Sequence, residues 1–368
     1  MWTGGVRMES RLPFYRGCLL GLAVGDAMGC TVDNKNWEEI CRDYGPNGLL
    51  GYDLQHDYAD VTSYTQLAVF VANGLLVGAT RGKGDTYSPY MAMALREWAK
   101  SQQFRTGAEK TMCWVAQIPG LRRRLCMDTR MLDTLTRDTL GTPERPLNPF
   151  TSPGGMTAAV AAGLFFAPGR MEPQQVGLLG AEAVAMLQGD PETFLSGAVL
   201  AYSIAGLLQD PEHPLLEQFT QAVDAVRAQF GERFPQAAAV AAQIDRAVRL
   251  TKAPKISPLE AMASLGCSTA SECLAGAVYA SLIHSGNFDE AMIVAVNHSG
   301  RSSAVGAVTG AILGAKLGEA SLPEFYLESL EPVESLRELA DDIARGRQIK
   351  RIFDDSWDHK YIQGMAPQ

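Results

Sequence analysis

The chain of 368 residues lacks a long apolar segment, and this absence gives the first classification. No run reaches the ~20 apolar residues that a membrane-spanning helix needs. The best candidate, 156–167, is too short and is rich in alanine and glycine, and the apolar run 18–24 has no signal-peptide cleavage pattern. We therefore expect a cytoplasmic protein without a membrane partner, and Met8 is an alternative start of the chain.

Metal-binding cysteine patterns and basic clusters are also missing. The seven cysteines are irregularly spaced and include no Cys-x-x-Cys pair, which favours reduced thiols over a zinc site or a disulfide framework. The formal net charge is −9, so we expect no nucleic-acid partner. Only 122–124 forms a run of three basic residues, and we expect it to lie on a solvated helix face.

Strand patterns are nearly absent, because no β-branched run alternates with polar residues. Apolar positions instead recur at helical spacing in 65–77, 182–186, 194–208, 215–230 and 237–250. Proline and glycine lie between these segments, and no change of composition marks a flexible linker. We predict an all-α protein with one compact helical domain at 11–352, an N-terminal extension at 1–10 and a C-terminal tail at 353–368.

Glycine recurs at every fourth position in two segments, 17–29 and 306–318. A glycine inside a helix costs about 1 kcal/mol relative to alanine, so such a row needs a structural reason. The row exposes bare backbone along one helix face and lets another helix approach closely. We predict that both helices are buried, and they are candidates to pack against each other.

Three polar segments accompany these apolar helices. Asp26 lies inside the first glycine segment, where a buried carboxylate needs a cation, a hydrogen-bond donor or solvent. Thr62 or Ser63 precedes an apolar helix and is suited to cap it. Ser302 and Ser303 are predicted to cap the second glycine helix, whose N-terminus favours anions.

Four ordered blocks carry a resemblance to the ADP-ribosylglycohydrolase family, which includes ADP-ribosylarginine hydrolases and the glycohydrolase that reactivates dinitrogenase reductase. The blocks are 16–29 with the core Gly-Asp-Ala-Met-Gly, 44–52, 152–156 and 297–315. The third block resembles a loop that ends in Gly-x-Met-Arg, with Thr157 where arginine is usual. The resemblance implies a single compact, orthogonal helical domain and an active site with two divalent cations, usually magnesium.

The chain departs from this family at the residues that the resemblance assigns to the metals. A Thr-Asp-Asp-Thr motif is replaced by Thr62-Ser63-Tyr64-Thr65, and an Asp-x-Asp-Ser/Thr motif is replaced by residues 301–304, which read Arg-Ser-Ser-Ala. Serine and tyrosine are neutral at pH 7, and a guanidinium repels a cation. We therefore expect no metal cofactor, with the magnesium site lost. We also expect Arg301 to balance Asp26 or Asp33, or to meet an anionic ligand.

Three functions remain open. The first is a degenerate member that binds ADP-ribose, or a protein or small molecule carrying it, without magnesium-dependent hydrolysis. The second is a metal-independent hydrolase of an N- or O-glycosidic bond with Asp26 or Asp33 as general base. The third is a structural or partner-binding scaffold. The candidate ligand-binding residues are Asp26, Asp33, Thr62, Ser63, Tyr64, Ser152, Gly154, Gly155, Met156, His298, Arg301, Ser302 and Ser303.

Overall fold

The computed structural model describes residues 9–54, 57–81, 86–103, 111–125, 127–166, 170–346 and 355–366. These residues form α-helices and short 3-10 helices, and none of them lies in a β-strand. Two isolated bridges, Ala59 with Leu330 and Thr142 with Arg145, are the extended pairings in these ranges. The predicted all-α single domain is confirmed. Met8 and Cys126 lie outside the described residues, and the six described cysteines form no disulfide bond with one another.

The predicted helices are present, mostly longer than the apolar patterns that indicated them. Segments 65–77, 194–208, 215–230 and 237–250 lie within single helices, and 182–186 overlaps the end of another. The helices are α2 (Leu12–Val32), α3 (Trp37–Tyr44), α4 (Ser63–Arg81), α5 (Ser88–Gln103), α6 (Thr129–Leu135), α7 (Val160–Phe165), α8 (Pro173–Ala185), α9 (Pro191–Gln209), α10 (Leu215–Phe230), α11 (Ala237–Thr251), α12 (Pro258–Leu265), α13 (Ala270–Ile283), α14 (Phe288–Val296), α15 (Ser302–Leu317), α16 (Glu324–Glu328), α17 (Val333–Arg345) and α18 (Asp355–Tyr361).

The two glycine rows pack directly against each other, as the sequence suggested. A Cβ atom at Gly21 would lie 2.2 Å from the carbonyl oxygen of Gly310, and one at Gly25 would lie 2.0 Å from that of Gly306. Real Cβ atoms do not approach backbone oxygen this closely, so the spacing of α2 and α15 requires glycine. Both helices are buried along almost their whole length, and they form the axis of the domain.

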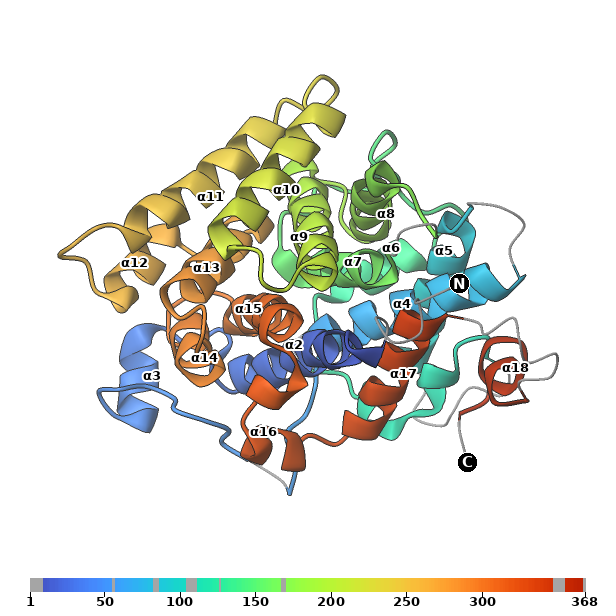
Figure 1. Ribbon diagram of the computed structural model, residues 1–368, viewed down its shortest axis with the longest axis horizontal. Helices are drawn as coiled ribbons and strands as arrows, with labels where there is room; N and C mark the ends of the chain where they lie inside the picture. Colours follow the sequence, from blue (N-terminus) through green and yellow to red (C-terminus); the bar gives the residue numbers. More distant parts are fainter. Residues whose placement is uncertain are drawn as a thin grey trace.

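The other helices surround this central pair (Figure 1). α13 and α14 contact α15, whereas α4 and α17 contact α2. This arrangement brings the N-termini of α4 and α15 to the C-terminal half of α2, where the polar residues are concentrated. One described helix, α9, is long and apolar enough to cross a membrane, but most of it is buried inside the protein.

The last described segment packs onto the domain. α18 contacts α4, and Trp357 and Tyr361 on it are buried. Lys360 is buried beside them and forms ion pairs with Glu338 (2.8 Å) and Asp342 of α17. The part of 353–368 that the structure describes therefore contributes to the packing, while the division at 10 and 352 stays a prediction.

Candidate functional site

Asp26, which lies in α2, caps the N-terminus of α4. Its carboxylate accepts hydrogen bonds from the backbone amides of Thr62 (2.8 Å) and Thr65 (3.0 Å), and from the hydroxyl groups of both threonines (2.6 Å each). The first amides of a helix have no partner within the helix, and a carboxylate there also favours the helix dipole. Asp26 is therefore a cap that α2 supplies to α4.

Hydrogen-bond donors, and not a cation, are the partners of the buried Asp26 carboxylate. Its carboxylate is buried, and the expected cation partner, Arg301, is replaced by the donors of Thr62 and Thr65. Burial raises the pKa of Asp26 to about 6, although these hydrogen bonds act in the opposite direction. The Thr62 hydroxyl also accepts a hydrogen bond from the Tyr64 amide (3.3 Å), so the prediction that Thr62 or Ser63 caps this helix is confirmed for Thr62.

Asp33 has the equivalent position at α15. It follows the last residue of α2, and its Oδ1 accepts a hydrogen bond from the Ser303 amide (3.1 Å). Asn34 donates to its Oδ2 (3.1 Å), and Arg301 Nη2 lies 3.8 Å from the same oxygen. Burial raises the pKa of the Asp33 carboxyl above its ordinary value, and the positive charge of Arg301 offsets part of this increase. The expected pairing of Arg301 is thus with Asp33 in this structure.

The predicted capping roles of Ser302 and Ser303 are wrong. Arg301 is the N-cap residue of α15 and makes no side-chain capping bond. The Ser302 hydroxyl donates to the carbonyl of Val296 (2.7 Å), and the Ser303 hydroxyl has no hydrogen-bond partner among the described residues. The cap comes from Asp33, which is 270 positions away in the chain, so no local pattern could indicate it.

Three buried polar atoms close to the start of α15 lack hydrogen-bond partners in the described part of the chain: Tyr64 Oη, Arg301 Nε and Ser303 Oγ. Tyr64 is 1% exposed and Ser303 is fully buried. Burial raises the pKa of the Tyr64 phenol well above its ordinary value, with Asp33 and Arg301 among its neighbours. The thiol of Cys273, buried beside Arg301 and Asp33, also has a strongly raised pKa and stays protonated.

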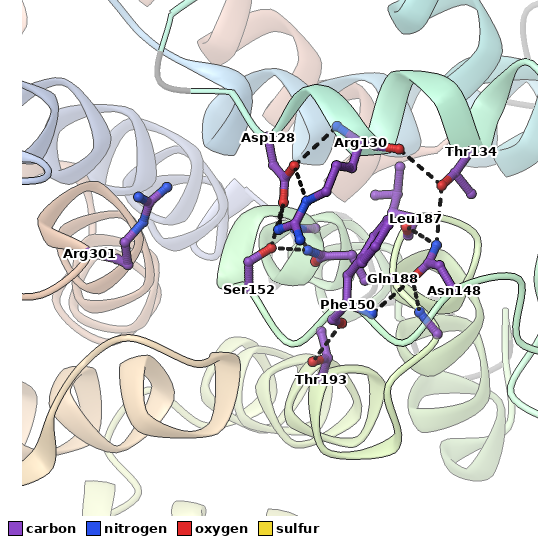
Figure 2. A network of polar contacts seen from close by, with 12 residues as sticks. Asp128, Arg130, Thr134, Asn148, Phe150, Ser152, Leu187, Gln188, Thr193 and Arg301 are labelled. Atoms are coloured by element: carbon purple, nitrogen blue, oxygen red, sulfur yellow. Dashed lines mark hydrogen bonds and ion pairs between the residues drawn. The ribbon is translucent and has the colours of Figure 1, made fainter.

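The 152–156 segment forms a separate hydrogen-bonded network. The Ser152 hydroxyl donates to Asp128 (2.8 Å) and accepts from Gln188, and Gln188 accepts from the Gly155 amide (2.7 Å). Figure 2 shows Ser152 between Asp128 and Gln188, with Arg301 to one side and no contact drawn to it. Gly154, Gly155 and Met156 are buried. The predicted site residues therefore form two groups in this structure.

A hydrogen bond links this segment to α4, which also packs against it. Thr157, which stands where the resemblance expects arginine, donates its hydroxyl proton to the carbonyl of Tyr64 (2.7 Å). Asp128, Gln188, Thr157 and Thr65 were all missed as site residues. Their partners are distant in the chain, so neither composition nor spacing identified them. For Thr65 and Thr157 a signal existed, because Thr65 ends the motif that begins at Thr62 and Thr157 stands where the resembling loop has arginine.

His298 supports the turn that leads into α15. Its Nε2 bonds to the carbonyl of Ala295 (3.0 Å), and its Nδ1 accepts from the Gly300 amide (2.9 Å). Burial lowers its pKa to about 4, so the ring is neutral at pH 7 with the proton on Nε2. Both ring nitrogens are occupied by backbone groups, and His298 offers neither of them to a ligand.

The basic run 122–124 does not lie on a helix face as expected. It follows the short 3-10 helix Pro119–Leu121, and Arg123 forms ion pairs with Asp60 and Glu331 (3.0 Å for the latter). The run lines a cavity of about 890 Å³. A second cavity, of about 400 Å³, lies beside α2, and Tyr58 and Asp60 line both cavities.

Comparisons with known proteins agree with this architecture. A family model for ADP-ribosylglycohydrolase matches residues 8–352. An uncharacterized protein of Archaeoglobus fulgidus is 28% identical over 335 residues, which are 89% of this chain and 94% of that protein. A solved chain of an "ADP-ribosylglycohydrolase-related protein complex" has the same fold, with a TM-score of 0.57 and 22% identity over 92% of this chain and 99% of that chain. The chain belongs to the ADP-ribosylglycohydrolase family.

Proposed function

We propose that this protein binds ADP-ribose, free or attached to a protein or small molecule, and does so without magnesium-dependent hydrolysis. The observation that carries the proposal is the guanidinium of Arg301 at the start of α15, 3.8 Å from Asp33, where the resemblance places a metal-binding aspartate. A guanidinium has a permanent positive charge and no lone pair for a metal. At position 301 the chain therefore carries a positive charge where the resemblance implies a negatively charged metal ligand.

The other residues at these positions do not fit a pair of magnesium ions. Magnesium prefers an octahedral set of oxygen ligands that includes carboxylates. Ser63, Tyr64 and Ser303 carry neutral hydroxyl groups, and burial keeps the Tyr64 phenol protonated. In the described ranges, no group of three or more His, Cys, Asp or Glu side chains is arranged to hold a metal ion.

The two surviving acids, Asp26 and Asp33, are engaged as helix caps rather than presented to a substrate. Asp26 already accepts four hydrogen bonds, and Asp33 accepts bonds from the Ser303 amide and Asn34. A general base needs a lone pair directed at the proton that it removes. This engagement favours binding over metal-independent hydrolysis. The reduced cysteines are consistent with our inference that the protein acts in the cytoplasm.

The proposal is tested by calorimetric titration of ADP-ribose into protein kept in excess chelator, together with an assay for release of ADP-ribose from ADP-ribosylarginine. We expect saturable binding in chelator and no release with or without magnesium. Magnesium-dependent release would contradict the proposal. Release in chelator would favour the metal-independent hydrolase, and absence of binding would favour a scaffold.

A further inference from the structure

We propose that Arg301, Tyr64 and Ser303 form a metal-free site for an oxyanion of the phosphate class. The inference rests on the proposed function and makes it more specific, because it assigns the diphosphate of ADP-ribose, rather than a ribose, to this position. It also accounts for the inverted charge at residue 301. The site consists of hydrogen-bond donors that the described residues leave without acceptors of good geometry.

Arg301 provides the charge of the site. Its Nη1 bonds to the neutral amide oxygen of Asn34, and its only described ion pair is with Asp33, at 3.8 Å. No described carboxylate is within hydrogen-bond distance of the guanidinium. Its Nε is buried, has no described partner and can only donate. The group that completes this site must therefore present an acceptor, and a guanidinium bonds most strongly to an oxyanion.

Tyr64 and Ser303 add two hydroxyl donors from different helices. Tyr64 lies in the first turn of α4 and Ser303 in the first turn of α15. Both side chains are at least nine-tenths buried, and neither hydroxyl group meets hydrogen-bond geometry with a described residue, while the Tyr64 phenol lies beside the Arg301 guanidinium. A buried hydroxyl without a partner is unfavourable, and native structures rarely retain one unless a water or ligand satisfies it. A tetrahedral oxyanion has enough acceptor oxygens for all three donors.

The nearest acid does not exclude an anion from this position. Asp33 Oδ1 accepts a hydrogen bond from the Ser303 amide and Oδ2 accepts one from Asn34, so both carboxylate oxygens are already engaged at the N-terminus of α15. Asp26 is stabilised in the same way at α4. The neutral thiol of Cys273 adds no negative charge. Arg301 has Asp33 as an ion-pair partner at 3.8 Å, but no carboxylate of the described residues is hydrogen-bonded to it.

Pyrophosphate is the probe that tests this site directly. Titrated by calorimetry into the chelator-treated protein at constant ionic strength, it should bind and should compete with ADP-ribose. Arg301→Lys keeps the charge but removes Nε, and Tyr64→Phe removes only the hydroxyl. Each should weaken pyrophosphate binding by about tenfold or more. Ser303→Ala should weaken it in the same direction.

Matched substitutions remote from the site serve as controls. Tyr202→Phe in α9 and Arg233→Lys should leave pyrophosphate affinity unchanged. Tyr64→Phe should not lower the thermal unfolding temperature, because the hydroxyl that it removes makes no hydrogen bond of good geometry with a described residue. A folded Tyr64→Phe variant therefore separates loss of binding from loss of structure.

The outcomes separate this inference from the proposed function. Absence of pyrophosphate binding, equal affinity in all variants, or competition by D-ribose but not by pyrophosphate would overturn the oxyanion site. If ADP-ribose binds while pyrophosphate neither binds nor competes, the site falls and the proposed function stands. If pyrophosphate binds through Arg301 and Tyr64 but ADP-ribose does not bind, the proposed function falls and the site stands.

Discussion

Asp26 and Asp33 have the same structural role at two different helices. Each is supplied by α2 or its C-terminal end, and each accepts backbone amide hydrogens at the start of a helix that is distant in the chain. The sequence indicated that a buried Asp26 needs a partner, but not which partner. An acid that appears catalytic by its position can instead hold two helices in register.

We predict that Asp26→Ala strongly destabilises the protein. The substitution leaves the amides and hydroxyl groups of Thr62 and Thr65 buried without an acceptor. We expect the free energy of unfolding at pH 7 to fall by about 2–4 kcal/mol. Urea unfolding measures this, with Asp133→Ala at an exposed position as control. A loss below about 0.5 kcal/mol would show that the cap contributes little.

The same carboxylate predicts a pH dependence. Burial raises the pKa of Asp26 in the folded protein to about 6 from an ordinary value of 3.8, so the folded state binds this proton more tightly than the unfolded state. The resulting stabilisation is complete below about pH 4 and is lost as the pH rises through 6. The difference in unfolding free energy between wild type and Asp26→Ala should therefore shrink between pH 4 and pH 7. A difference that grows over this range would mean that the hydrogen bonds outweigh burial.

The helices α2 and α15 show what a sequence pattern can predict about packing. Glycine at every fourth position, with apolar residues between, indicated buried helices with a close neighbour, and the structure pairs the two rows. The helix beginning at residue 302 was also expected. Its cap was assigned wrongly, because Asp33 reaches it from the other helix and replaces the local serines in this role.

Gly310→Ala should destabilise the central pair. The added Cβ would lie 1.9 Å from the carbonyl oxygen of Gly21, which belongs to helix backbone and cannot move independently. We expect a loss of about 2 kcal/mol or more in unfolding free energy, although alanine is the better helix former. Gly286→Ala is the control, because no atom lies within 4 Å of its added Cβ. Equal stability of the two variants would contradict the close-packing account.

The whole fold could be predicted further than the site. Helical periodicity and the absence of strand patterns identified the all-α domain, because each helix buries a local apolar pattern of its own. The site depends on contacts such as those of Asp26 with Thr65 and of Ser152 with Gln188, which join distant segments. The resemblance predicted that Tyr64, Arg301 and Ser303 lie in one region. His298 was predicted as a ligand-binding residue, because the sequence does not indicate that backbone groups occupy its ring nitrogens.

The central claim is that this member of the family does not hold magnesium at the N-termini of α4 and α15. Calorimetric titration of magnesium into metal-free protein tests it directly. We predict no saturable binding tighter than about 1 mM and no increase in unfolding temperature, since a ligand that binds the folded state stabilises it in proportion to its affinity. A magnesium dissociation constant tighter than about 1 mM that weakens when Thr62 or Asp33 is replaced by alanine would contradict the account.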